Sequence, residues 1–516
     1  MRVPPAAHSS AAHSSAAPLT DPAVVDALGV DLRAAGYSVD GVAAILPDDV
    51  NAALGRGVWW PALALTRGVD AAVAPLATII RLFILGSEEP EELVAQSFPS
   101  LTAQALIGAG VLERVSGGLL RASLDIRPHG DDQREYLVIS DQDAAMRSGP
   151  VAHDHVLGIG GASVSLARAI IREPVGRALD LGTGCGIQAL HLDGHCAEIV
   201  ATDTNDRALR LAAATARING MSWDLRAGSL FEPVEGERFD LIVSNPPFVV
   251  GAGDRDYIYR DSGMAGDALC ESLIRGIPDH LNPGGTAQLL ANWVIGEGVD
   301  WRDRVRGWLD GTGLDAWVVQ REAADPIDYI SLWLSDAGER PEDSARRGAD
   351  WLAFFEQAGI SAIGMGVITL RAPDEPGRRA PDVVIEEITG AGEEVTGFEA
   401  QAFLARRTYL RTTSDDQLMR RRLTTAPVFL EDQSLPGSEG WQRVSATVRR
   451  PGGPGAVLGV DEVSRALLAG CRGEVPLGVL IDLLAGHHGV DADALAQAAL
   501  PVVREAIGRG ILYEAE

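Results

Sequence analysis

The sequence predicts an α/β core with a parallel sheet, flanked on both sides by helical units. Between residues 150 and 335, short apolar runs expected as strands alternate with helical runs. Strand and helix in turn, at this spacing, imply right-handed crossovers and therefore a parallel sheet. The flanking segments instead carry helical runs that end in short extended runs. This second pattern predicts helical, winged-helix-like domains on either side of the core.

Length and composition support several domains in a globular chain. The 516 residues exceed one ordinary domain, and hydrophobic residues make up 46% against 22% charged residues. The net charge of -28 argues against a general basic surface for nucleic acid. All 44 basic residues are arginine, which is typical of a GC-rich bacterial genome and excludes lysine-based chemistry. None of the 4 cysteines forms a Cys-x-x-Cys pair, so neither a zinc ribbon nor a disulfide framework is predicted.

The N-terminal residues 1–18 are predicted to be a disordered tail. They repeat Ala-Ala-His-Ser-Ser and lack the apolar segment of a secretory signal. No apolar run in the chain reaches the ~18 residues that a membrane span needs. We therefore expect a cytoplasmic protein that makes no membrane contact.

Residues 19–145 are expected to form a helical, winged-helix-like domain. The extended runs Val111–Val115 and Leu119–Ile126 flank a Ser-Gly-Gly turn, which predicts a hairpin. The candidate recognition helix, Pro99–Gly110, contains no basic residue. A helix that reads a major groove needs arginine or lysine for bases and phosphates. A role in protein docking or internal packing is therefore favoured over DNA binding.

The core is expected over residues 146–338, and two further segments follow it. Residues 339–455 are expected to be an extension, and residues 456–516 a small winged-helix-like domain. Within the core, Tyr329–Leu334 is interpreted as a strand. The extension carries nine arginines between positions 406 and 450. Such a cluster either holds RNA or an acidic partner, or pairs with carboxylates of the chain itself.

A glycine-rich turn follows the first core strand. Gly182, Gly184 and Gly186 stand between that strand and a helix, where glycine allows a tight turn and a close backbone approach to a ligand. Asp203 ends the second strand, in a position to accept hydrogen bonds from both hydroxyls of a ribose. Asp180, two residues before the first glycine, suits a cationic ligand better than a pyrophosphate. A nucleoside cofactor is predicted, although a relaxed dinucleotide fingerprint fits the glycines alone.

The third core strand ends in Asn245-Pro-Pro-Phe248. Two prolines end the strand and remove two backbone donors, which leaves a rigid turn that presents carbonyl oxygens. The Asn245 side-chain oxygen and the Pro246 carbonyl can accept the two N–H groups of a planar amide or amine. Phe248 can stack on that flat group. These residues predict methyl transfer to a conjugated nitrogen, without a metal and without a strong base.

These motifs resemble those of class I S-adenosylmethionine-dependent methyltransferases in the Asn-Pro-Pro-aromatic group, over about residues 150–335. The group includes methylases of the adenine exocyclic amine, methylases of the guanine exocyclic amine in ribosomal RNA, and HemK-like enzymes that methylate a release-factor glutamine. The resemblance implies a Rossmann-like core and S-adenosyl-L-methionine as the cofactor. It also implies that the residues holding the methionine part are Asp180, Gly182, Gly184 and Gly186.

The same resemblance implies contacts to the nucleoside half of the cofactor. Asp203 would hold the ribose. Ser229 stands where many relatives carry an acid that meets the adenine amine, and a serine can still accept a hydrogen bond there. Gly158–Ser163 is interpreted as a cofactor lid or, equally, a glycine-rich linker. The loop Gly251–Asp267 follows the Asn-Pro-Pro-Phe turn, and this position predicts a substrate loop, with an ordinary surface loop as the alternative.

Histidine and cysteine side chains near these motifs could in principle bind a metal or act as a nucleophile. His153 and His155 could form a metal pair, but no third ligand stands nearby in the sequence, so no metal site is predicted. Cys185, inside the glycine turn, is expected to fill space rather than act as a nucleophile.

The sequence as a whole predicts a cytoplasmic S-adenosylmethionine-dependent N-methyltransferase with a planar amide or amino acceptor. The acidic composition and the uncharged candidate recognition helix favour a protein glutamine, for instance in a translation factor. A nucleobase in RNA or DNA is the alternative, supported by the arginine-rich segment. A non-catalytic, cofactor-sensing regulator is the third reading, against which the intact Asn245–Phe248 motif argues.

Overall fold

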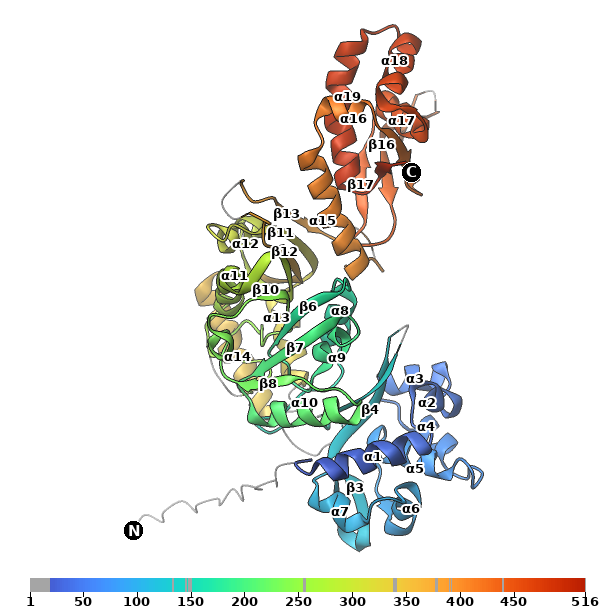
Figure 1. The fold of residues 1–516 in the computed structure, drawn as a ribbon, viewed down its shortest axis with the longest axis vertical. Coiled ribbons are helices and arrows are strands. Elements are labelled where there is room, and N and C mark those ends of the chain that lie inside the picture. Colours follow the sequence, from blue (N-terminus) through green and yellow to red (C-terminus); the bar gives the residue numbers. More distant parts are fainter. Residues whose placement is uncertain are drawn as a thin grey trace.

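The computed structural model describes residues 19–131, 134–143, 146, 151–253, 257–336, 341–375, 379–388, 390, 392–438 and 440–515. The predicted tail, 1–18, lies outside these residues. The described chain forms an N-terminal helical unit, a central unit built on a large sheet, and a C-terminal unit, placed one after another along the long axis (Figure 1).

The N-terminal unit is mainly helical. Its first helix begins at Pro22 after Asp21, whose side chain accepts the amide of Ala23, a combination typical of a helix start. The predicted hairpin is confirmed by strands β2 and β3, which pair antiparallel. The elements of this unit are α1 (Pro22–Ala34), α2 (Val39–Ile45), α3 (Asp48–Gly55), α4 (Trp60–Thr66), α5 (Ala74–Phe83), β1 (Glu89–Pro90), α6 (Glu91–Ser97), α7 (Ala103–Gly108), β2 (Leu112–Arg114) and β3 (Leu119–Ala122).

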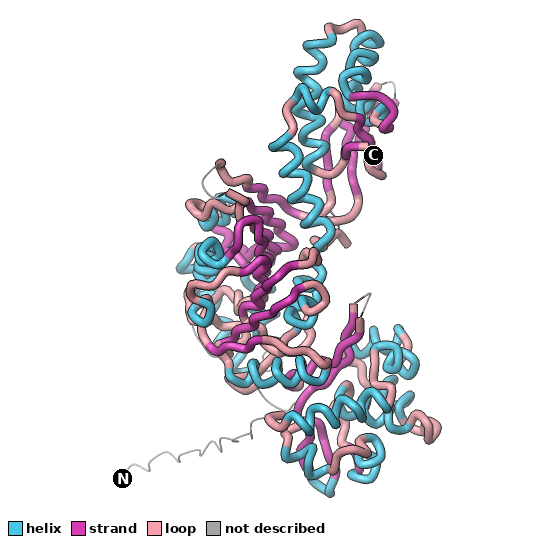
Figure 2. The backbone as a smooth tube through the Cα atoms, in the orientation of Figure 1, coloured by secondary structure: helices cyan, strands magenta, loops and turns pink. Residues whose placement is uncertain are grey.

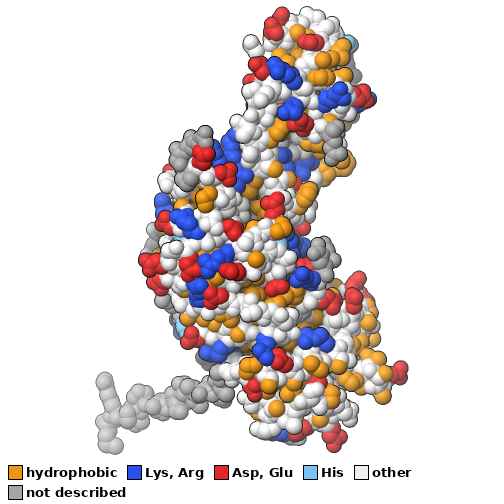
Figure 3. Space-filling model, viewed as in Figure 1, with side chains coloured by type: hydrophobic (Ala, Val, Ile, Leu, Met, Phe, Trp, Pro, Cys, Tyr) orange, Lys and Arg blue, Asp and Glu red, His pale blue; other side chains and the backbone are white. Residues whose placement is uncertain are grey.

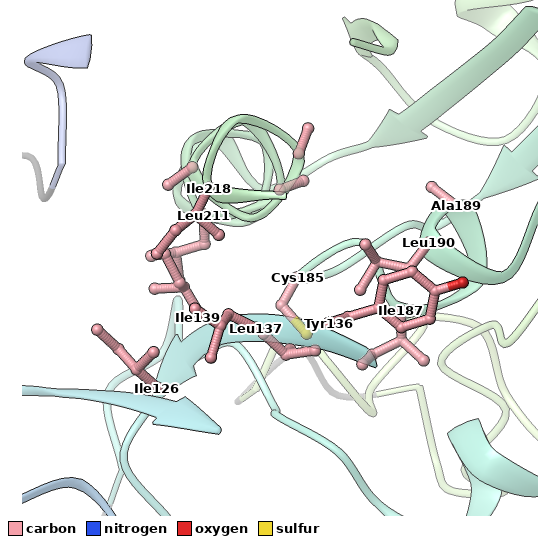
Figure 4. Packing of buried hydrophobic residues seen from close by; sticks show 14 of the residues in the cluster. Ile126, Tyr136, Leu137, Ile139, Cys185, Ile187, Ala189, Leu190, Leu211 and Ile218 are labelled. Atoms are coloured by element: carbon pink, nitrogen blue, oxygen red, sulfur yellow. The ribbon is translucent and has the colours of Figure 1, made fainter. Parts of the chain in front are cut away.

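A long hairpin joins the N-terminal unit to the centre of the molecule. Its strands are β4 (Leu124–Gly130) and β5 (Glu135–Asp141), which pair antiparallel. Apolar side chains of this hairpin pack with the glycine turn and the helices behind it in one continuous core (Figure 4). Cys185 lies in that core, 3% exposed, and burial raises the pKa of its thiol to about 12. A thiol held neutral in this way fills space, as expected, and is a poor nucleophile.

The central unit contains a sheet of eight strands in the order β13-β11-β12-β10-β9-β6-β7-β8. The strands of this sheet are drawn in magenta in the middle of the molecule (Figure 2). Strands β6 to β10 run parallel, and β12 runs antiparallel to both of its neighbours. The predicted α/β core with a mostly parallel sheet is therefore confirmed. Its elements are α8 (Gly161–Ala169), β6 (Val175–Leu181), α9 (Ile187–Leu192), β7 (Cys196–Asp203), α10 (Asp206–Ile218), β8 (Asp224–Ala227), β9 (Phe239–Ser244), α11 (Ala268–His280), β10 (Leu281–Gly296), α12 (Trp301–Leu309), β11 (Asp315–Ala324), α13 (Pro326–Asp336), α14 (Pro341–Ala358), β12 (Ile360–Arg371) and β13 (Val383–Glu387).

Both faces of the sheet are buried, and the side chains of each strand alternate between them. In β9, Leu241 and Val243 belong to the core that contains α8, α9 and α10, whereas Ile242 belongs to the core that contains α11 and α12. Such a two-sided sheet has nearly continuous apolar strands. Its order reverses at β6, which has β7 on one side and β9 on the other. In open α/β sheets this reversal opens a crevice at the carboxyl ends of the strands.

Three details of the predicted organisation are wrong. Tyr329–Leu334 is not a strand but part of α13. The core does not end at residue 338, because β12 and β13 lie beyond it and belong to the central sheet. Residue 455 is not a domain boundary either, because β17 on its far side pairs with β16. The first error concerns a short apolar run that suits a strand or a helix equally. The other two concern pairing between distant segments, which local sequence does not specify.

The C-terminal unit combines two small sheets with helices around one apolar core. The predicted terminal strand is present as β19, which pairs with β14. The elements of this unit are α15 (Gly397–Thr412), α16 (Asp415–Met419), β14 (Arg422–Thr425), β15 (Phe429–Gly437), β16 (Gly440–Arg450), β17 (Ala456–Gly459), α17 (Glu462–Gly470), β18 (Arg472–Pro476), α18 (Leu477–His488), α19 (Ala492–Gly508) and β19 (Leu512–Glu514).

The arginine cluster between 406 and 450 is largely neutralised by the chain itself. Arg406 and Arg450 both reach the buried Glu399, at 2.7 and 2.8 Å, and Arg407 pairs with Asp382 at 2.7 Å. Basic and acidic side chains are interspersed on the visible surface (Figure 3). The arginines of the cluster with an acidic partner are Arg406, Arg407, Arg411, Arg421, Arg443, Arg449 and Arg450. The structure thus favours internal ion pairs over an RNA-binding patch.

None of the described helices combines the length and the apolar character that crossing a bilayer requires.

Candidate active site

A cavity of about 510 Å³ opens at the carboxyl ends of β6, β7 and β9. It lies where the strand order reverses, the position expected for a ligand site in this fold. Of the residues predicted for the site, Gly182, Gly184, Asp203, Ser229, Asn245 and Pro246 line it. Asp180, Gly186 and Phe248 are not among the lining residues.

The three glycines of the turn serve two different purposes. All have a positive φ, of 77° at Gly182, 57° at Gly184 and 91° at Gly186. A Cβ atom on either of the first two would meet open space, which is the space of the cavity. A Cβ atom on Gly186 would lie 2.6 Å from the ring of Trp223. Gly182 and Gly184 therefore leave room for a ligand, whereas Gly186 allows the turn to pack on Trp223.

Substitution of Gly184 by alanine tests this division. Gly220, just beyond α10, is a matched control because its φ is also positive, 72°, with open space around a Cβ. Both substitutions should lower the free energy of unfolding by a similar amount, about 1 kcal/mol, from backbone strain. Only Gly184→Ala should also weaken cofactor binding in calorimetry, because only its methyl group enters the cavity. Equal cofactor affinity in the two variants would contradict the assignment.

Asp203 ends β7 at the edge of the cavity. One carboxylate oxygen accepts the Gly184 amide at 2.9 Å, and the other accepts the Asn205 amide at 2.8 Å. Burial raises the pKa of this carboxyl group, against the lowering effect of these backbone donors. Each oxygen keeps a further lone pair that can accept a hydrogen bond from a vicinal diol. The contact with Gly184 also fixes the glycine turn against the strand end.

Asp180 lies beneath the glycine turn and supports it. Its Oδ2 atom accepts the Thr183 hydroxyl at 2.6 Å and the Ala189 amide at 3.1 Å, which ties the turn to α9. Its Oδ1 atom is buried without a hydrogen-bond partner among the described residues. Burial raises the pKa of this carboxyl group to about 7. Asp180 thus shapes the glycine turn through these hydrogen bonds. A direct contact between Asp180 and the cofactor stays a prediction.

The raised pKa of Asp180 predicts a pH-dependent contribution to stability. The group binds its proton more tightly in the folded chain, with a pKa of about 7, than in the unfolded chain, with ~3.9. The resulting stabilisation is complete below the unfolded value and is lost as the pH rises through the folded value. Asp180→Asn should remove a slope of up to about 1.4 kcal/mol per pH unit between these values. Urea unfolding across this range checks it, and parallel curves for the two proteins would refute it.

The Asn-Pro-Pro-Phe turn contributes Asn245 and Pro246 to the lining of the cavity, and Asn245 carries a buried acceptor atom. The Asn245 side chain lies with its Nδ2 atom 3.5 Å from the Ser163 hydroxyl, and its Oδ1 atom is buried without a hydrogen-bond partner among the described residues. Leaving such an acceptor unpaired costs about 1–3 kcal/mol. The Pro246 carbonyl accepts the Phe248 amide at 2.7 Å and keeps a second lone pair. Both predicted acceptors therefore have free capacity at the cavity.

Phe248 lies beside the turn, outside the lining of the cavity. It is half-buried and meets Trp333 of α13 edge-on, with ring centroids 6.2 Å apart and an angle of 69°. Stacking of this ring on a flat acceptor group stays a prediction. The cavity is instead lined by the phenol ring of Tyr259, from the loop predicted to face the substrate. This loop thus reaches the site, as its position in the sequence predicts.

Ser229 is exposed at the rim of the cavity, next to a residue with an unusual backbone. Leu230 also lines the cavity and has a φ of 51°, in the left-handed region that leucine seldom adopts. Such backbone strain costs about 1–3 kcal/mol and clusters at ligand sites. Ser229 could be predicted from the sequence. Leu230 could not, because a leucine in the sequence does not indicate a left-handed backbone.

The glycine-rich stretch before β6 lies at the cavity. Gly158 and Ser163 line it, and the Ser163 carbonyl accepts Nε2 of Gln188 at 3.0 Å. The chain just before this stretch is held by Asp141, which accepts the Val156 amide at 2.9 Å and pairs with Arg207. Sequence reasoning missed Asp141, because its partners come from segments far away in the chain.

Comparison with known proteins agrees with this geometry. Residues 158–297 match the model of the methyltransferase small domain, and residues 34–123 and 401–514 match two domains of unknown function, DUF7059 and DUF7782. The release factor glutamine methyltransferase of Xylella fastidiosa is 38% identical over 136 residues, which are 24% of this chain and 49% of that protein. Ribosomal RNA small subunit methyltransferase C of Klebsiella pneumoniae is 35% identical over 119 residues, 23% of this chain and 31% of that protein.

These relatives resemble only part of the chain, which spans half of their length or less. Among solved structures, a ribosomal protein L11 methylase from Lactobacillus delbrueckii matches with 24% identity and a TM-score of 0.22, over 30% of this chain and 68% of that one. The matched segment of this chain contains the glycine turn, Asp203 and the Asn-Pro-Pro-Phe turn. Residues 158–297 are therefore a methyltransferase small domain, built on the class I fold of S-adenosylmethionine-dependent methyltransferases.

Proposed function

We propose that the chain is an N-methyltransferase that uses S-adenosylmethionine and methylates a planar amide or amino nitrogen. The observation that carries this proposal is the buried Oδ1 atom of Asn245, which has no hydrogen-bond partner among the described residues and belongs to a residue that lines the cavity. A rigid acceptor beside a nucleoside-sized cavity suits a substrate that brings its own N–H groups.

The residues at the cavity fit this cofactor. Asp203 can accept both ribose hydroxyls, and the space above Gly182 and Gly184 can hold the methionine part against the backbone. Ser229 and Leu230 also line the cavity, where they would meet the adenine. When bound, S-adenosylmethionine supplies an electrophilic methyl group on a sulfonium centre. Asp180 contributes indirectly, through the shape of the turn.

The chain's own residues prepare the acceptor nitrogen. Asn245 Oδ1 and the Pro246 carbonyl accept its two N–H groups, which fixes the direction of the nitrogen lone pair and favours the electron-rich form of the nitrogen. No charged base is needed for this step. Burial of the Asn245 Oδ1 atom limits access of water, which would otherwise compete for this acceptor.

A protein glutamine is the acceptor we favour, for instance in a translation factor, as in the relative named release factor glutamine methyltransferase. The ion-paired arginine cluster removes the main support for a nucleic-acid acceptor. A nucleobase stays the second candidate because another relative is a ribosomal RNA methyltransferase. We further propose that the enzyme works in the cytoplasm and that its flanking winged-helix-like units dock proteins.

Methyl transfer from radiolabelled S-adenosylmethionine decides between these acceptors. The purified chain is incubated with lysate that has been treated with RNase or with protease. Label that survives RNase and is lost to protease supports a protein acceptor, and the reverse supports a nucleic acid. Cofactor binding without transfer to either fraction would favour a regulator, and absence of cofactor binding would refute the proposal altogether.

A further inference from the structure

The connection between β11 and β12 is much longer than its geometry requires. These strands are antiparallel neighbours, for which a hairpin of ~2 residues is sufficient. The chain instead uses residues 325–359, which carry helices α13 and α14. A connection this long, with its own secondary structure, usually has a function of its own.

This helical insertion, α13 and α14, forms hydrogen bonds with the residues that follow the Asn-Pro-Pro-Phe turn. The Tyr329 hydroxyl accepts the Val250 amide at 2.9 Å, and Trp351 donates to the Val250 carbonyl at 2.9 Å. Arg260 donates to the Trp333 carbonyl at 2.6 Å. Tyr329 and Arg260 are almost fully buried. These contacts hold the insertion against the chain that follows the turn.

Helix α14 and the described chain at 249–253 and 257–264 enclose a second cleft, of about 720 Å³. Its lining shares His153, Asp261 and Ser262 with the cofactor cavity, so the two spaces adjoin. A large molecule that places one group against Asn245 needs room for the parts next to that group. This cleft is the space that adjoins the cofactor cavity. Gly251 and Gly253 are among its lining residues.

The charges of the cleft do not suit a phosphate backbone. The described lining residues include three arginines, Arg260, Arg346 and Arg347, and three aspartates, Asp261, Asp343 and Asp350, so they carry no net formal charge. Nucleic-acid sites instead concentrate positive charge along the backbone path.

The aromatic rings of the cleft do not suit base stacking either. Guanidinium groups lie over the Tyr257 ring, with Arg260 at 4.6 Å and Arg347 at 5.6 Å from its centroid. Trp351 is tied to Val250 through its indole nitrogen. Single-stranded nucleic acids bind by stacking bases on open aromatic faces, and here the phenol face is already used by cations.

We infer that this cleft binds the polypeptide segment around the acceptor residue, and that helix α14 selects a segment with side chains of both charges. The inference rests on the proposed methyl transfer and narrows its acceptor to protein. Arg346 and Asp350 are the exposed charges on α14 that such a segment would meet. They lie one helical turn apart and offer one contact of each sign.

Charge reversal at these two positions tests the inference. Arg346→Glu and Asp350→Arg are compared with Arg306→Glu and Asp303→Arg on α12, exposed charges outside both cavities. Each variant receives radiolabelled S-adenosylmethionine with RNase-treated lysate or with protein-free total RNA. Both α14 variants should lose about fivefold or more of the transfer to protein at limiting acceptor. The α12 controls should keep it, and all four should bind the cofactor like wild type in calorimetry.

Other outcomes overturn the inference in distinguishable ways. Unchanged transfer to protein in both α14 variants would exclude α14 from acceptor recognition. If the label enters RNA, and Asp350→Arg raises that transfer while Arg346→Glu lowers it, the cleft holds a phosphate backbone instead. A wild-type chain that binds no cofactor would overturn the proposed function itself, and the role of the cleft with it.

Discussion

Replacing Asp203 by alanine is expected to weaken binding of S-adenosylmethionine by at least ~100-fold, because the variant loses charge-assisted hydrogen bonds worth about 1.5–3 kcal/mol each. The same carboxylate also accepts the Gly184 amide, so the variant loses the restraint on the glycine turn as well. Isothermal titration calorimetry measures the effect directly. It is the largest effect on binding that the site predicts, since no other charged side chain among the lining residues ends a strand of the sheet at the cavity.

A matched control separates this effect from a general loss of charge. Asp206, at the start of α10, is exposed and does not line the cavity. Asp206→Ala should bind the cofactor like wild type. Asp203→Asn keeps one acceptor oxygen and should fall between the two. Thermal unfolding shows whether Asp203→Ala is folded. A folded Asp203→Ala variant with wild-type affinity would refute the assignment of the cavity.

The glycine turn and the two strand ends at Asp203 and Asn245 could be predicted because a few consecutive residues are sufficient to recognise each of them. Gly182, Gly184 and Asp203 need no distant partner to be recognised. The parallel sheet then brings the carboxyl ends of its strands together, so that Asp203 and Asn245 meet although they lie far apart in the sequence. The alternation of short strands and helices is therefore sufficient to place this half of the site.

The second cleft, which adjoins the cofactor cavity, could not be predicted because distant segments build it. Helix α14 joins the cleft only because its hairpin folds back onto Val250, through Tyr329 and Trp351. Tyr329–Leu334 is apolar enough to suit a strand, and only packing decides that it is helical. The surroundings of Phe248 could not be predicted either, because its neighbour Trp333 comes from that helix. Local sequence thus specifies the glycine turn, Asp203 and Asn245, whereas tertiary packing specifies the adjoining cleft.

Replacing Asn245 by alanine is expected to lower kcat by about 10²–10³-fold, the usual cost of removing one preorganised group that stabilises a transition state. The cofactor affinity should stay unchanged, because the strand end and the glycine turn that bind it are intact. If Asn245 stabilises the nitrogen as it becomes electron-rich in the transition state, the loss should appear in kcat. A loss in KM would instead indicate that Asn245 only binds the substrate in its ground state. Single-turnover transfer from labelled cofactor, at saturating acceptor, measures this step.

Two further variants decide whether orientation or hydrogen-bond acceptance is responsible. Ser163→Ala removes the hydroxyl 3.5 Å from Asn245 Nδ2, a distance too long for a strong contact, so its kcat should fall only a few fold. Asn245→Gln keeps the amide but displaces it by one methylene, which should cost nearly as much as alanine because the acceptor must meet the nitrogen at a fixed place. If Asn245→Ala instead retained wild-type kcat while cofactor binding stayed intact, the unpaired oxygen would have no part in methyl transfer. The cavity would then be better explained as the sensing site of a non-catalytic regulator.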